Sequence, residues 1–284
     1  MRVLSLFDGI SCGMVALERA GIPVERYVAY EIDKCAIQIS KKNYPQIEHC
    51  GDVTTADFTQ YNGFDLLIGG SPCQSLSITQ SKMRKHLYGK SKLFFEFVRA
   101  KEEMRPRYFL FENVASMNDE SRRVISNCLG CEPRLVNSGI FSAQDRPRLY
   151  WTNIPFKFPL QTRNLVLRDI LEAQVDEKYY YNCGFDYLGE KNVAAILHIN
   201  GHDILKRVQS PNFKSHTLTT CGGGNTQKKV LVNGRARKLT PIEYERLQTL
   251  PDNYTAGISD TRRYTAVGNG WTVDVIAHIL KNLI

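Results

Sequence analysis

The sequence contains no segment of low complexity and no apolar run that approaches the length of a membrane span, about 20 residues. A strand is predicted from Arg2 onward, where a secretory leader would place its charged and apolar regions. We therefore predict neither a membrane anchor nor a signal peptide, and we expect a cytoplasmic protein.

The eight cysteines are dispersed and lack the dense spacing of a small secreted scaffold, so we expect reduced thiols. Cys128 and Cys131 form a single Cys-x-x-Cys pair, without a second pair or a histidine pair at zinc-finger spacing to complete a metal site. His198 and His202 are four residues apart, but Asn200-Gly201 between them argues against a helix. The sequence therefore predicts no metal centre.

The charge of the chain is moderately biased toward basic residues. It has 37 Lys and Arg against 29 Asp and Glu, which gives a formal net charge of +8. Such a bias favours a polyanionic partner but does not separate DNA from RNA. With 284 residues, 43% of them hydrophobic, the chain can form one large α/β domain and a small additional domain.

The first half of the chain alternates strands and helices as a parallel sheet requires. Apolar runs predict strands at residues 2–7, 26–30, 64–68, 108–111, 134–137 and 149–152. Helical patterns cover residues 12–20, 34–43, 93–104 and 120–129. After residue 155 the segments become short and mixed, with one clear helix at residues 241–250. The sequence thus predicts an α/β, doubly wound domain over residues 1–154, a smaller inserted domain over 155–264 and a final helix within 265–284.

Side chains that could take part in catalysis follow two of these strands. Cys73 ends the turn Gly69-Gly70-Ser71-Pro72-Cys73, and Glu112 opens Glu112-Asn113-Val114 after the next strand. Ligands gather outside the carboxyl ends of parallel strands, so a thiol placed there is a candidate nucleophile, although such a cysteine is more often a small buried residue. Two further motifs favour catalysis: Gln144-Asp145-Arg146-Pro147-Arg148 before a strand and Val267-Gly268-Asn269-Gly270 before the last helix.

Together, Pro-Cys-Gln, Glu-Asn-Val, Gln-x-Arg-x-Arg and the late Gly-Asn resemble the motifs of the cytosine-5 DNA methyltransferases, in that family's order and over nearly the whole chain. Ser5-Leu6-Phe7-Asp8-Gly9 and Leu93-Phe94-Phe95-Glu96-Phe97 are closest to the de novo type of these enzymes. The resemblance implies a Rossmann-like S-adenosylmethionine-dependent methyltransferase domain, an inserted target-recognition domain and a C-terminal helix that returns to the catalytic domain. It also implies double-stranded DNA as partner, a monomer or weak homo-oligomer, and a prokaryotic or phage-encoded origin.

The turn from Phe7 to Gly13 joins the first strand to the first helix, where backbone amides at a helix N-terminus can meet a ligand. Tight strand-to-helix packing explains such a turn equally well. Glu31 follows about twenty positions later and is placed to accept hydrogen bonds from ribose hydroxyls. Asp52 either contacts the adenine amino group, as the resemblance implies, or caps its own turn. The resemblance implies an S-adenosylmethionine site, with S-adenosylhomocysteine as the product, formed by Phe7, Asp8, Gly9, Gly13, Glu31, Ile32, Asp52, Val53, Pro72, Asn269 and Trp271.

The resemblance also implies covalent catalysis on a cytosine that is flipped out of the duplex. The Cys73 thiolate adds to carbon 6 and activates carbon 5, while Glu112 stabilises the charge that develops at ring nitrogen 3. Arg148 holds the exocyclic oxygen of the base, and Arg146 supports the catalytic loop. The predicted catalytic residues are Cys73, Gln74, Glu112, Asn113, Arg146 and Arg148.

The segment from Gln74 to about Lys92 is rich in serine, lysine and glycine, which is typical of a loop that closes over a substrate, although a solvated linker has the same composition. The smaller domain is expected to read the DNA sequence, mainly through residues 156–213. The predicted DNA contacts are Lys82, Arg84, Lys85, Gln144, Lys228 and Lys229.

Two other functions are compatible with the same core. RNA cytosine-5 methyltransferases usually carry a second proline before the cysteine and a Cys-Phe-Thr tripeptide, and neither occurs here. A catalytically silent DNA-binding regulator would have a broken Pro-Cys or Glu-Asn-Val motif, and both are intact. The motifs therefore favour DNA methylation, by an enzyme that belongs to a restriction-modification system, is solitary or is phage-borne.

Overall fold

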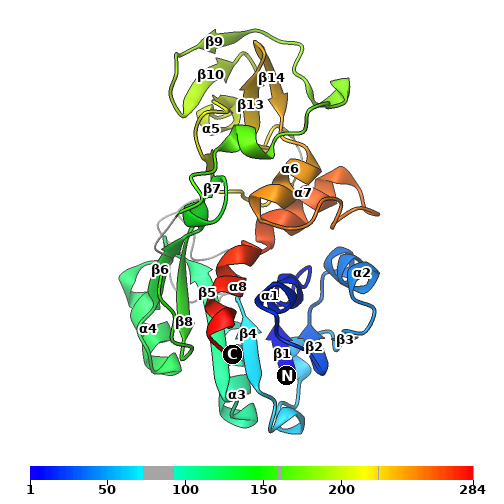
Figure 1. Cartoon of the computed structure of the whole chain (residues 1–284), viewed down its shortest axis with the longest axis vertical. Helices are drawn as coiled ribbons and strands as arrows, with labels where there is room; N and C mark the ends of the chain where they lie inside the picture. Colours follow the sequence, from blue (N-terminus) through cyan, green and yellow to red (C-terminus); the bar gives the residue numbers. More distant parts are fainter. Residues whose placement is uncertain (73–92, 159–161, 223, 284) are drawn as a thin grey trace. The chain divides into compact units, whose positions relative to one another are not determined.

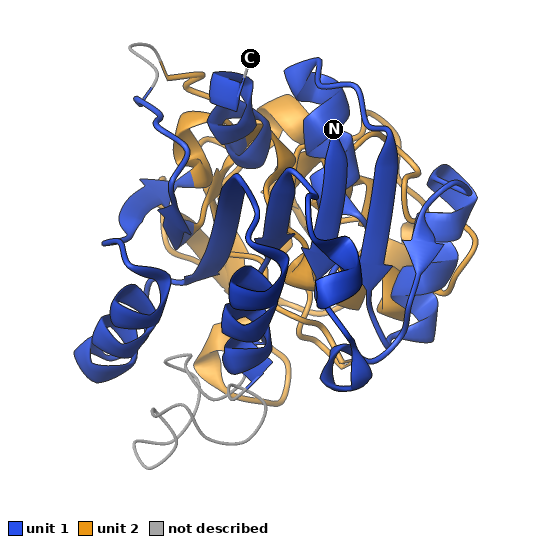
Figure 2. Ribbon diagram, turned by 90° about the horizontal axis from the view of Figure 1, so that it is seen from below, with its two compact units in different colours: residues 1–137, 147–158, 275–284 blue, residues 138–146, 159–274 orange. Residues whose placement is uncertain are grey.

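The computed structural model describes residues 1–72, 93–158, 162–222 and 224–283 (Figure 1). The chain divides into two compact units (Figure 2): unit 1 comprises residues 1–137, 147–158 and 275–284, and unit 2 comprises residues 138–146 and 159–274. None of the helices in these described ranges is long and apolar enough to cross a membrane.

Unit 1 is built on a seven-stranded sheet with the order β3-β2-β1-β4-β5-β8-β6. Its strands are β1 (Arg2–Leu6), β2 (Arg26–Tyr30), β3 (Glu48–His49), β4 (Leu66–Gly69), β5 (Tyr108–Val114), β6 (Arg134–Asn137) and β8 (Pro147–Thr152). β1 to β5 are parallel, whereas β8 runs antiparallel to both β5 and β6. The strand order reverses between β1 and β4, which creates the switch point at which open α/β sheets bind ligands.

Helices lie on both faces of this sheet (Figure 2), which explains why the central strand β4 is buried along its whole length. They are α1 (Cys12–Ala20), α2 (Lys34–Asn43), α3 (Phe94–Met104), α4 (Asp119–Leu129) and α8 (Val273–Leu280), with the 3-10 helices η1 (Val53–Thr55), η2 (Thr59–Tyr61) and η8 (Lys281–Leu283). On one face, the ring of Phe97 packs 4.9 Å from that of Phe111. Gly69 is required beneath them, because an added Cβ would lie 2.7 Å from the carbonyl oxygen of Leu6.

Unit 2 contains a five-stranded sheet with the order β14-β13-β11-β10-β9 and a separate two-stranded pair, β12 with β7. The strands are β7 (Gln144–Asp145), β9 (Phe185–Tyr187), β10 (Val193–Leu197), β11 (Arg207–Gln209), β12 (Ser215–His216), β13 (Lys229–Val232) and β14 (Arg235–Lys238). The helices are α5 (Asp203–Lys206), α6 (Pro241–Leu247) and α7 (Asp260–Asn269), with η5 (Ser138–Ile140), η6 (Leu167–Ile170) and η7 (Glu177–Tyr179). Thr240 and Glu243 form a capping box that begins α6.

The compact units begin and end at other residues than the predicted domains. Residues 138–146 belong to unit 2, because β7 pairs with β12, whereas the sequence pattern placed them in the large domain. Residues 265–274 also belong to unit 2, and only residues 275–284 of the final segment belong to unit 1. Helix α7 was not predicted. The predicted final helix corresponds to α8, which begins at Val273.

Candidate active site

The strands β1, β2, β4 and β5 end along one side of the unit 1 sheet, which we call the carboxyl edge. Leu6 of β1 pairs with Tyr30 of β2 and with Gly69 of β4. Gly69 in turn pairs with Phe111 of β5. The residues at the next level of this edge are therefore Glu31, Phe7, Gly70 and Glu112. The register thus brings predicted cofactor residues and a predicted catalytic residue to one edge.

Glu31 is held in a fixed orientation by three backbone amides. Its Oε2 accepts a hydrogen bond from Gly9 N at 2.8 Å, and its Oε1 accepts from the amides of Ile32 and Asp33 at 2.8 Å each. The loop after β1 is thereby tied to the end of β2. An ionised carboxylate offers about four acceptor sites, so Glu31 retains capacity for a ligand hydroxyl.

Ile32 and Asp52 differ in what they offer at this edge. Ile32 is 71% exposed, so a large apolar side chain is available to the flat face of a ligand. Asp52 caps η1: its Oδ1 accepts hydrogen bonds from the amide and the hydroxyl of Thr54, both at 2.9 Å, and these bonds lower the pKa of Asp52. Val53 beside it is buried. Turn capping is therefore a role that Asp52 has in the structure, and its adenine contact stays a prediction.

Asp8 and Gly13, two predicted cofactor residues, have structural explanations. A Cβ added at Gly13 would lie 2.4 Å from Ile68 Cδ1 and 2.8 Å from the Tyr27 hydroxyl, so glycine allows α1 to pack on the sheet. The carboxylate of Asp8 accepts hydrogen bonds from the hydroxyls of Ser5, Ser11 and Tyr27, and its burial raises its pKa. The packing interpretation of this turn thus accounts for both residues.

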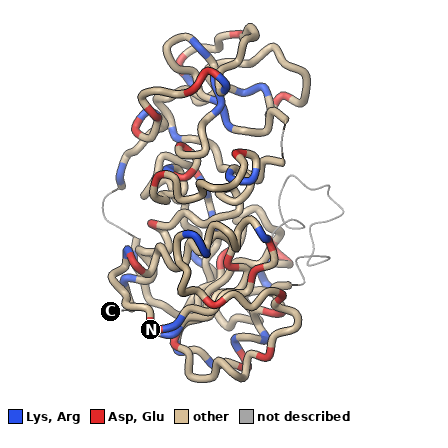
Figure 3. Tube along the Cα trace, turned by 90° about the vertical axis from the view of Figure 1, so that its right-hand side faces the viewer, with Lys and Arg blue, Asp and Glu red and all other residues tan. Residues whose placement is uncertain are grey.

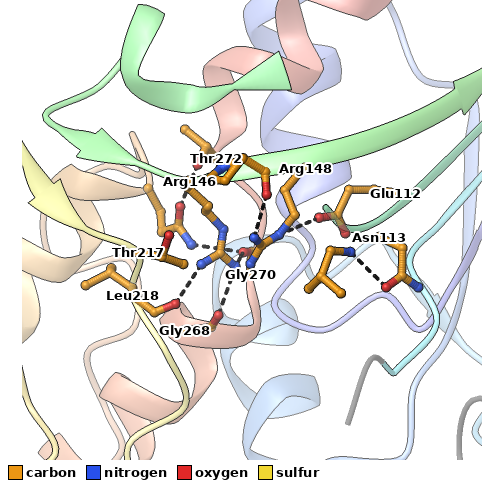
Figure 4. Close-up of polar contacts among 12 residues, drawn as sticks. Glu112, Asn113, Arg146, Arg148, Thr217, Leu218, Gly268, Gly270 and Thr272 are labelled. Atoms are coloured by element: carbon orange, nitrogen blue, oxygen red, sulfur yellow. Dashed lines mark hydrogen bonds and ion pairs between the residues drawn. The ribbon is translucent and has the colours of Figure 1, made fainter. Parts of the chain in front are cut away.

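Glu112 and Arg148 form an ion pair at the carboxyl edge, with 3.0 Å between Glu112 Oε1 and Arg148 Nε (Figure 4). Glu112 pairs with Tyr150 across β5 and β8, and Arg148 pairs with Val114, so the two charged residues are diagonal neighbours on one face. Because β8 runs antiparallel, its beginning lies beside the end of β5. The arginine at the start of one strand therefore meets the carboxylate at the end of another.

Asn113 lies on the opposite face of β5 and is buried. Its side-chain Nδ2 donates hydrogen bonds to the carbonyl and the hydroxyl of Ser71, at 3.3 and 3.4 Å. Its Oδ1 accepts from Val114 N at 2.8 Å (Figure 4). Asn113 thus holds the turn that continues through Pro72 into Cys73. Five predicted site residues lie outside the described residues, namely Cys73, Gln74, Lys82, Arg84 and Lys85.

Arg146 is buried within unit 2 and binds three backbone carbonyl groups (Figure 4). Its Nη1 donates to the oxygen of Leu218 at 2.8 Å, and its Nη2 donates to those of Gly268 and Gly270 at 3.0 and 3.1 Å. These bonds fix the backbone around Asn269 and Trp271, two further predicted cofactor residues. The described role of Arg146 is therefore to hold this turn, and its support of Cys73 stays a prediction.

Two predicted DNA contacts, Gln144 and Lys229, are buried in unit 2 and have no surface to offer. The Gln144 amide donates to Leu247 O at 3.1 Å and accepts from Leu218 N at 2.8 Å. Lys229 Nζ donates to the oxygens of Asn225 and Gln227 at 2.7 and 3.0 Å, and burial lowers its pKa to about 8. Lys228 directly precedes β13 and is half-buried, and successive strand residues point to opposite faces.

Lys228, the other lysine of this pair, lies beside a basic residue that the sequence prediction missed. Gln209 pairs with Val230 between the parallel strands β11 and β13, which puts Arg207 at the level of Lys228. Among the described residues, no carboxylate forms an ion pair with either cation. Burial lowers the pKa of His216, and the charges of Lys228 and Arg207 lower it further. These three residues form a basic cluster in unit 2, whose other charges are mixed in sign (Figure 3).

Comparison with known families and proteins gives a consistent result. The model of a family described as C-5 cytosine-specific DNA methylase matches residues 1–284. The chain is 28% identical over 431 residues to the orphan methyltransferase M.SPBetaI of Bacillus phage SPbeta, with 100% of this chain and 97% of the relative covered. It is 30% identical over 319 residues to the type II methyltransferase M1.ScrFI of Lactococcus lactis subsp. cremoris, with 100% and 78% covered.

Solved structures show the same fold. A putative DNA modification methyltransferase encoded within an Escherichia coli prophage superposes with a TM-score of 0.71 at 19% identity, over 100% of this chain and 98% of that one. The Dnmt2 methyltransferase of S. pombe superposes with a TM-score of 0.70 at 20% identity, over 100% and 99%. The predicted α/β, Rossmann-like methyltransferase fold is thereby confirmed.

Proposed function

This chain belongs to the C-5 cytosine-specific DNA methylase family, and we propose a covalent route, through Cys73, by which it transfers a methyl group from S-adenosylmethionine to carbon 5 of cytosine in DNA. The predicted family, activity and cofactor are confirmed by the whole-chain match. The observation that carries the covalent route is the Glu112–Arg148 pair, which lies at the carboxyl edge near the turn that leads into Cys73.

The residues of the carboxyl edge fit S-adenosylmethionine chemically. Glu31 presents an oriented carboxylate to a ribose hydroxyl, and exposed Ile32 presents an apolar surface to an aromatic ring. The amide of Gly9 orients Glu31 from the loop after β1. When bound, the cofactor supplies a methyl group on a positively charged sulfur.

The protein's own groups make cytosine reactive toward that methyl group. The sulfur of Cys73 forms a bond to carbon 6, and the electron pair released from the ring double bond makes carbon 5 nucleophilic. Glu112, held by Arg148, provides the hydrogen bond or proton that balances charge at ring nitrogen 3. After methylation, carbon 5 loses its proton, and cleavage of the sulfur–carbon 6 bond returns the thiolate and the aromatic ring.

Covalent trapping tests this route. DNA with 5-fluorocytosine at the target position should form a complex with the enzyme and S-adenosylmethionine that survives denaturing electrophoresis, because fluorine does not leave carbon 5 as a proton does. Cys73→Ser should abolish the complex and keep DNA binding. Cys50→Ser is the matched control, since Cys50 is the exposed cysteine of the described residues. Trapping that persists in Cys73→Ser would exclude Cys73 as the nucleophile.

For the substrate, we propose that unit 2 supplies DNA contacts and that Arg207 and Lys228 bind backbone phosphate. Two neighbouring cations without a carboxylate partner among the described residues favour an anionic ligand, and phosphate oxygens are the anions of duplex DNA. Burial lowers the pKa of Lys228, so a phosphate there would stabilise its charged form. Base readout is assigned to residues 156–213, as the sequence predicts.

Salt titration of DNA binding tests the phosphate contacts. Arg207→Ala and Lys228→Ala should each weaken binding to every duplex alike and lower the slope of log affinity against log salt by about 0.9. Lys191→Ala, another unit 2 lysine outside the cluster, is the control and should leave the slope unchanged. An unchanged slope in the two cluster variants would place the phosphate contacts elsewhere. Exchange of residues 156–213 for those of a relative should redirect the methylated sequence.

A further inference from the structure

A row of polar groups in unit 1, buried or half-buried, ends on the carboxylate of Asp8. Asp8 Oδ1 accepts hydrogen bonds from the Ser5 hydroxyl at 2.6 Å and from the Tyr27 hydroxyl at 2.7 Å. Its Oδ2 accepts from the Ser11 hydroxyl. The three donors come from β1, from β2 and from the residue before α1, and all three are buried. One carboxylate therefore joins three segments beneath the carboxyl edge.

The row extends from Ser11 to Ser40 of α2 and His49 of β3. Ser11 Oγ lies 2.6 Å from Ser40 Oγ, and Ser40 Oγ lies 3.1 Å from His49 Nε2. A hydroxyl has a single proton, and Ser11 donates its own to Asp8, so it must accept from Ser40. Ser40 in turn must accept from His49, which assigns the proton of the neutral ring to Nε2. The Nδ1 of His49 is buried without a partner in the described structure, as expected for the unprotonated nitrogen. Every bond of this row is thus directed toward Asp8.

The loop that this row anchors has a conformation that side chains disfavour. Phe7 and Ser11 have φ values of 58° and 59°, in the left-handed region that non-glycine residues rarely adopt. Asp8 lies next to Phe7 and forms the hydrogen bonds that hold Ser11. It also precedes Gly9, whose amide binds Glu31. Loss of the Asp8 contacts would therefore disturb both the loop and the orientation of Glu31.

We propose that the side chain of Asp8 is a positioning residue for S-adenosylmethionine: it holds residues 7–11 in the binding conformation and does not itself contact the cofactor. The carboxylate already accepts hydrogen bonds from three protein hydroxyls, which occupy most of its about four acceptor sites and direct it toward the fold. The inference rests on the cofactor use of the family and replaces the prediction that this side chain binds the cofactor.

Cofactor binding to an isosteric variant tests the proposal. Asp8→Asn replaces one carboxylate oxygen by an NH2 group, which is a donor. Where that oxygen accepted a hydrogen bond from the Ser11 hydroxyl, two donors then face each other, so the loop loses an anchor without a change of volume. The Kd for S-adenosylmethionine, measured by equilibrium dialysis without DNA, should rise about 10- to 100-fold, the scale at which orienting contacts act. The kcat at saturating cofactor should change by less than about threefold, because the reacting groups are untouched.

Rescue by Ser11→Gly separates positioning from direct contact. Glycine adopts φ 59° without an anchor, and it removes the hydroxyl donor that the N–H of the introduced amide would face, so the double variant should regain most of the lost affinity. A carboxylate that touches the cofactor would not be rescued, and an unrescued double variant would overturn the proposal. If Asp8→Asn does not fold, Tyr27→Phe and Ser40→Ala remove single bonds of the row. Each of these two substitutions should raise the Kd for S-adenosylmethionine, by less than the roughly 10- to 100-fold rise expected for Asp8→Asn. Wild-type affinity in both variants would also overturn the proposal.

The dialysis assay involves neither DNA nor Cys73, so its result is independent of the covalent route. Trapping on 5-fluorocytosine DNA at saturating cofactor should remain intact in the Asp8 variant. A loss of trapping with normal cofactor binding would count against the catalytic assignment and not against the role of Asp8.

Discussion

An arginine–carboxylate pair occurs in both units, and its surroundings decide what it does. At the carboxyl edge of unit 1, the side chains of Glu112 and Arg148 keep 12% and 13% of their surface accessible. In unit 2, the side chains of Arg237 and Glu243 are 2% and 0% exposed, with 2.6 Å between Arg237 Nη2 and Glu243 Oε1. The first pair can meet a substrate, whereas the second joins β14 to α6 inside the unit.

The buried pair is fully hydrogen-bonded, as burial demands. Glu243 Oε2 accepts from Arg237 Nη1 and from the Thr240 amide at 2.8 Å each, and Oε1 accepts from the Glu172 amide at 3.0 Å. Removal of one partner from such a pair leaves an uncompensated charge, which is costly. The comparison therefore predicts that substitutions in the first pair affect catalysis and that those in the second affect stability.

The largest effect is expected for Glu112→Gln. It keeps a hydrogen-bond donor but cannot exchange a proton with ring nitrogen 3, so single-turnover methylation should fall on the order of 10²- to 10⁴-fold. Its unfolding temperature should remain close to that of the wild type. Wild-type turnover, or an activity loss matched by unfolding, would contradict the assignment of this pair to chemistry.

A smaller effect, on stability, is expected for Glu243→Gln. The substitution leaves the Arg237 guanidinium buried without its charge partner, and the unfolding free energy from urea titration should fall by about 3–5 kcal/mol. Activity per folded molecule should be unchanged. The double variant Arg237→Met, Glu243→Leu should recover much of the loss, because two apolar groups need no partner. A variant that loses activity but no stability would remove the contrast between the pairs.

The smallest effect concerns the buried amine of Lys229. Burial lowers its pKa to about 8 from the ordinary value of 10.5, so between these values the unfolded chain binds a proton that the folded chain has released. Folding stability should therefore gain a contribution from Lys229 as the pH rises through this window, of up to about 1.4 kcal/mol per pH unit. The difference between wild type and Lys229→Met in urea titrations measures it. A difference that does not change with pH would show that this lysine is charged when folded.

Apolar runs were sufficient to predict six of the seven strands of unit 1, because the inner strands of a parallel sheet are buried on both faces; the two-residue strand β3 was missed. The ends of those strands then located Glu31 and Glu112 at one edge. The direction of β8 did not follow from the pattern, since an apolar run does not indicate which way a strand runs. The pairing of β7 escaped prediction for another reason: two residues are too short for any periodicity.

Polar residues were the main source of error. A buried lysine or glutamine has the same letter in the sequence as an exposed one, so Gln144 and Lys229 were predicted to bind DNA. Only the structure reveals that neighbouring carbonyl groups satisfy them. The hydroxyl partners of Asp8, which are scattered from Ser5 to Tyr27, likewise become its neighbours only after folding. Contacts between distant residues decide whether a polar side chain serves a ligand or the fold.

The membership of β7 in unit 2 limits how this unit, to which we assign DNA recognition, can be exchanged between relatives. Residues 138–146 precede β8 in the chain, yet the Gln144 side chain bonds to Leu218, Leu247 and Gln248. If residues 159–274 of a relative were grafted alone, all three hydrogen-bond partners of the host's Gln144 would come from the relative. Such a graft should therefore include the relative's residues 138–146 as well. A graft confined to residues 159–213 keeps all three partners native. An exchange of unit 2 between relatives therefore has two junctions before β8, one at each end of residues 138–146. An alignment of residues 159–274 alone does not show them.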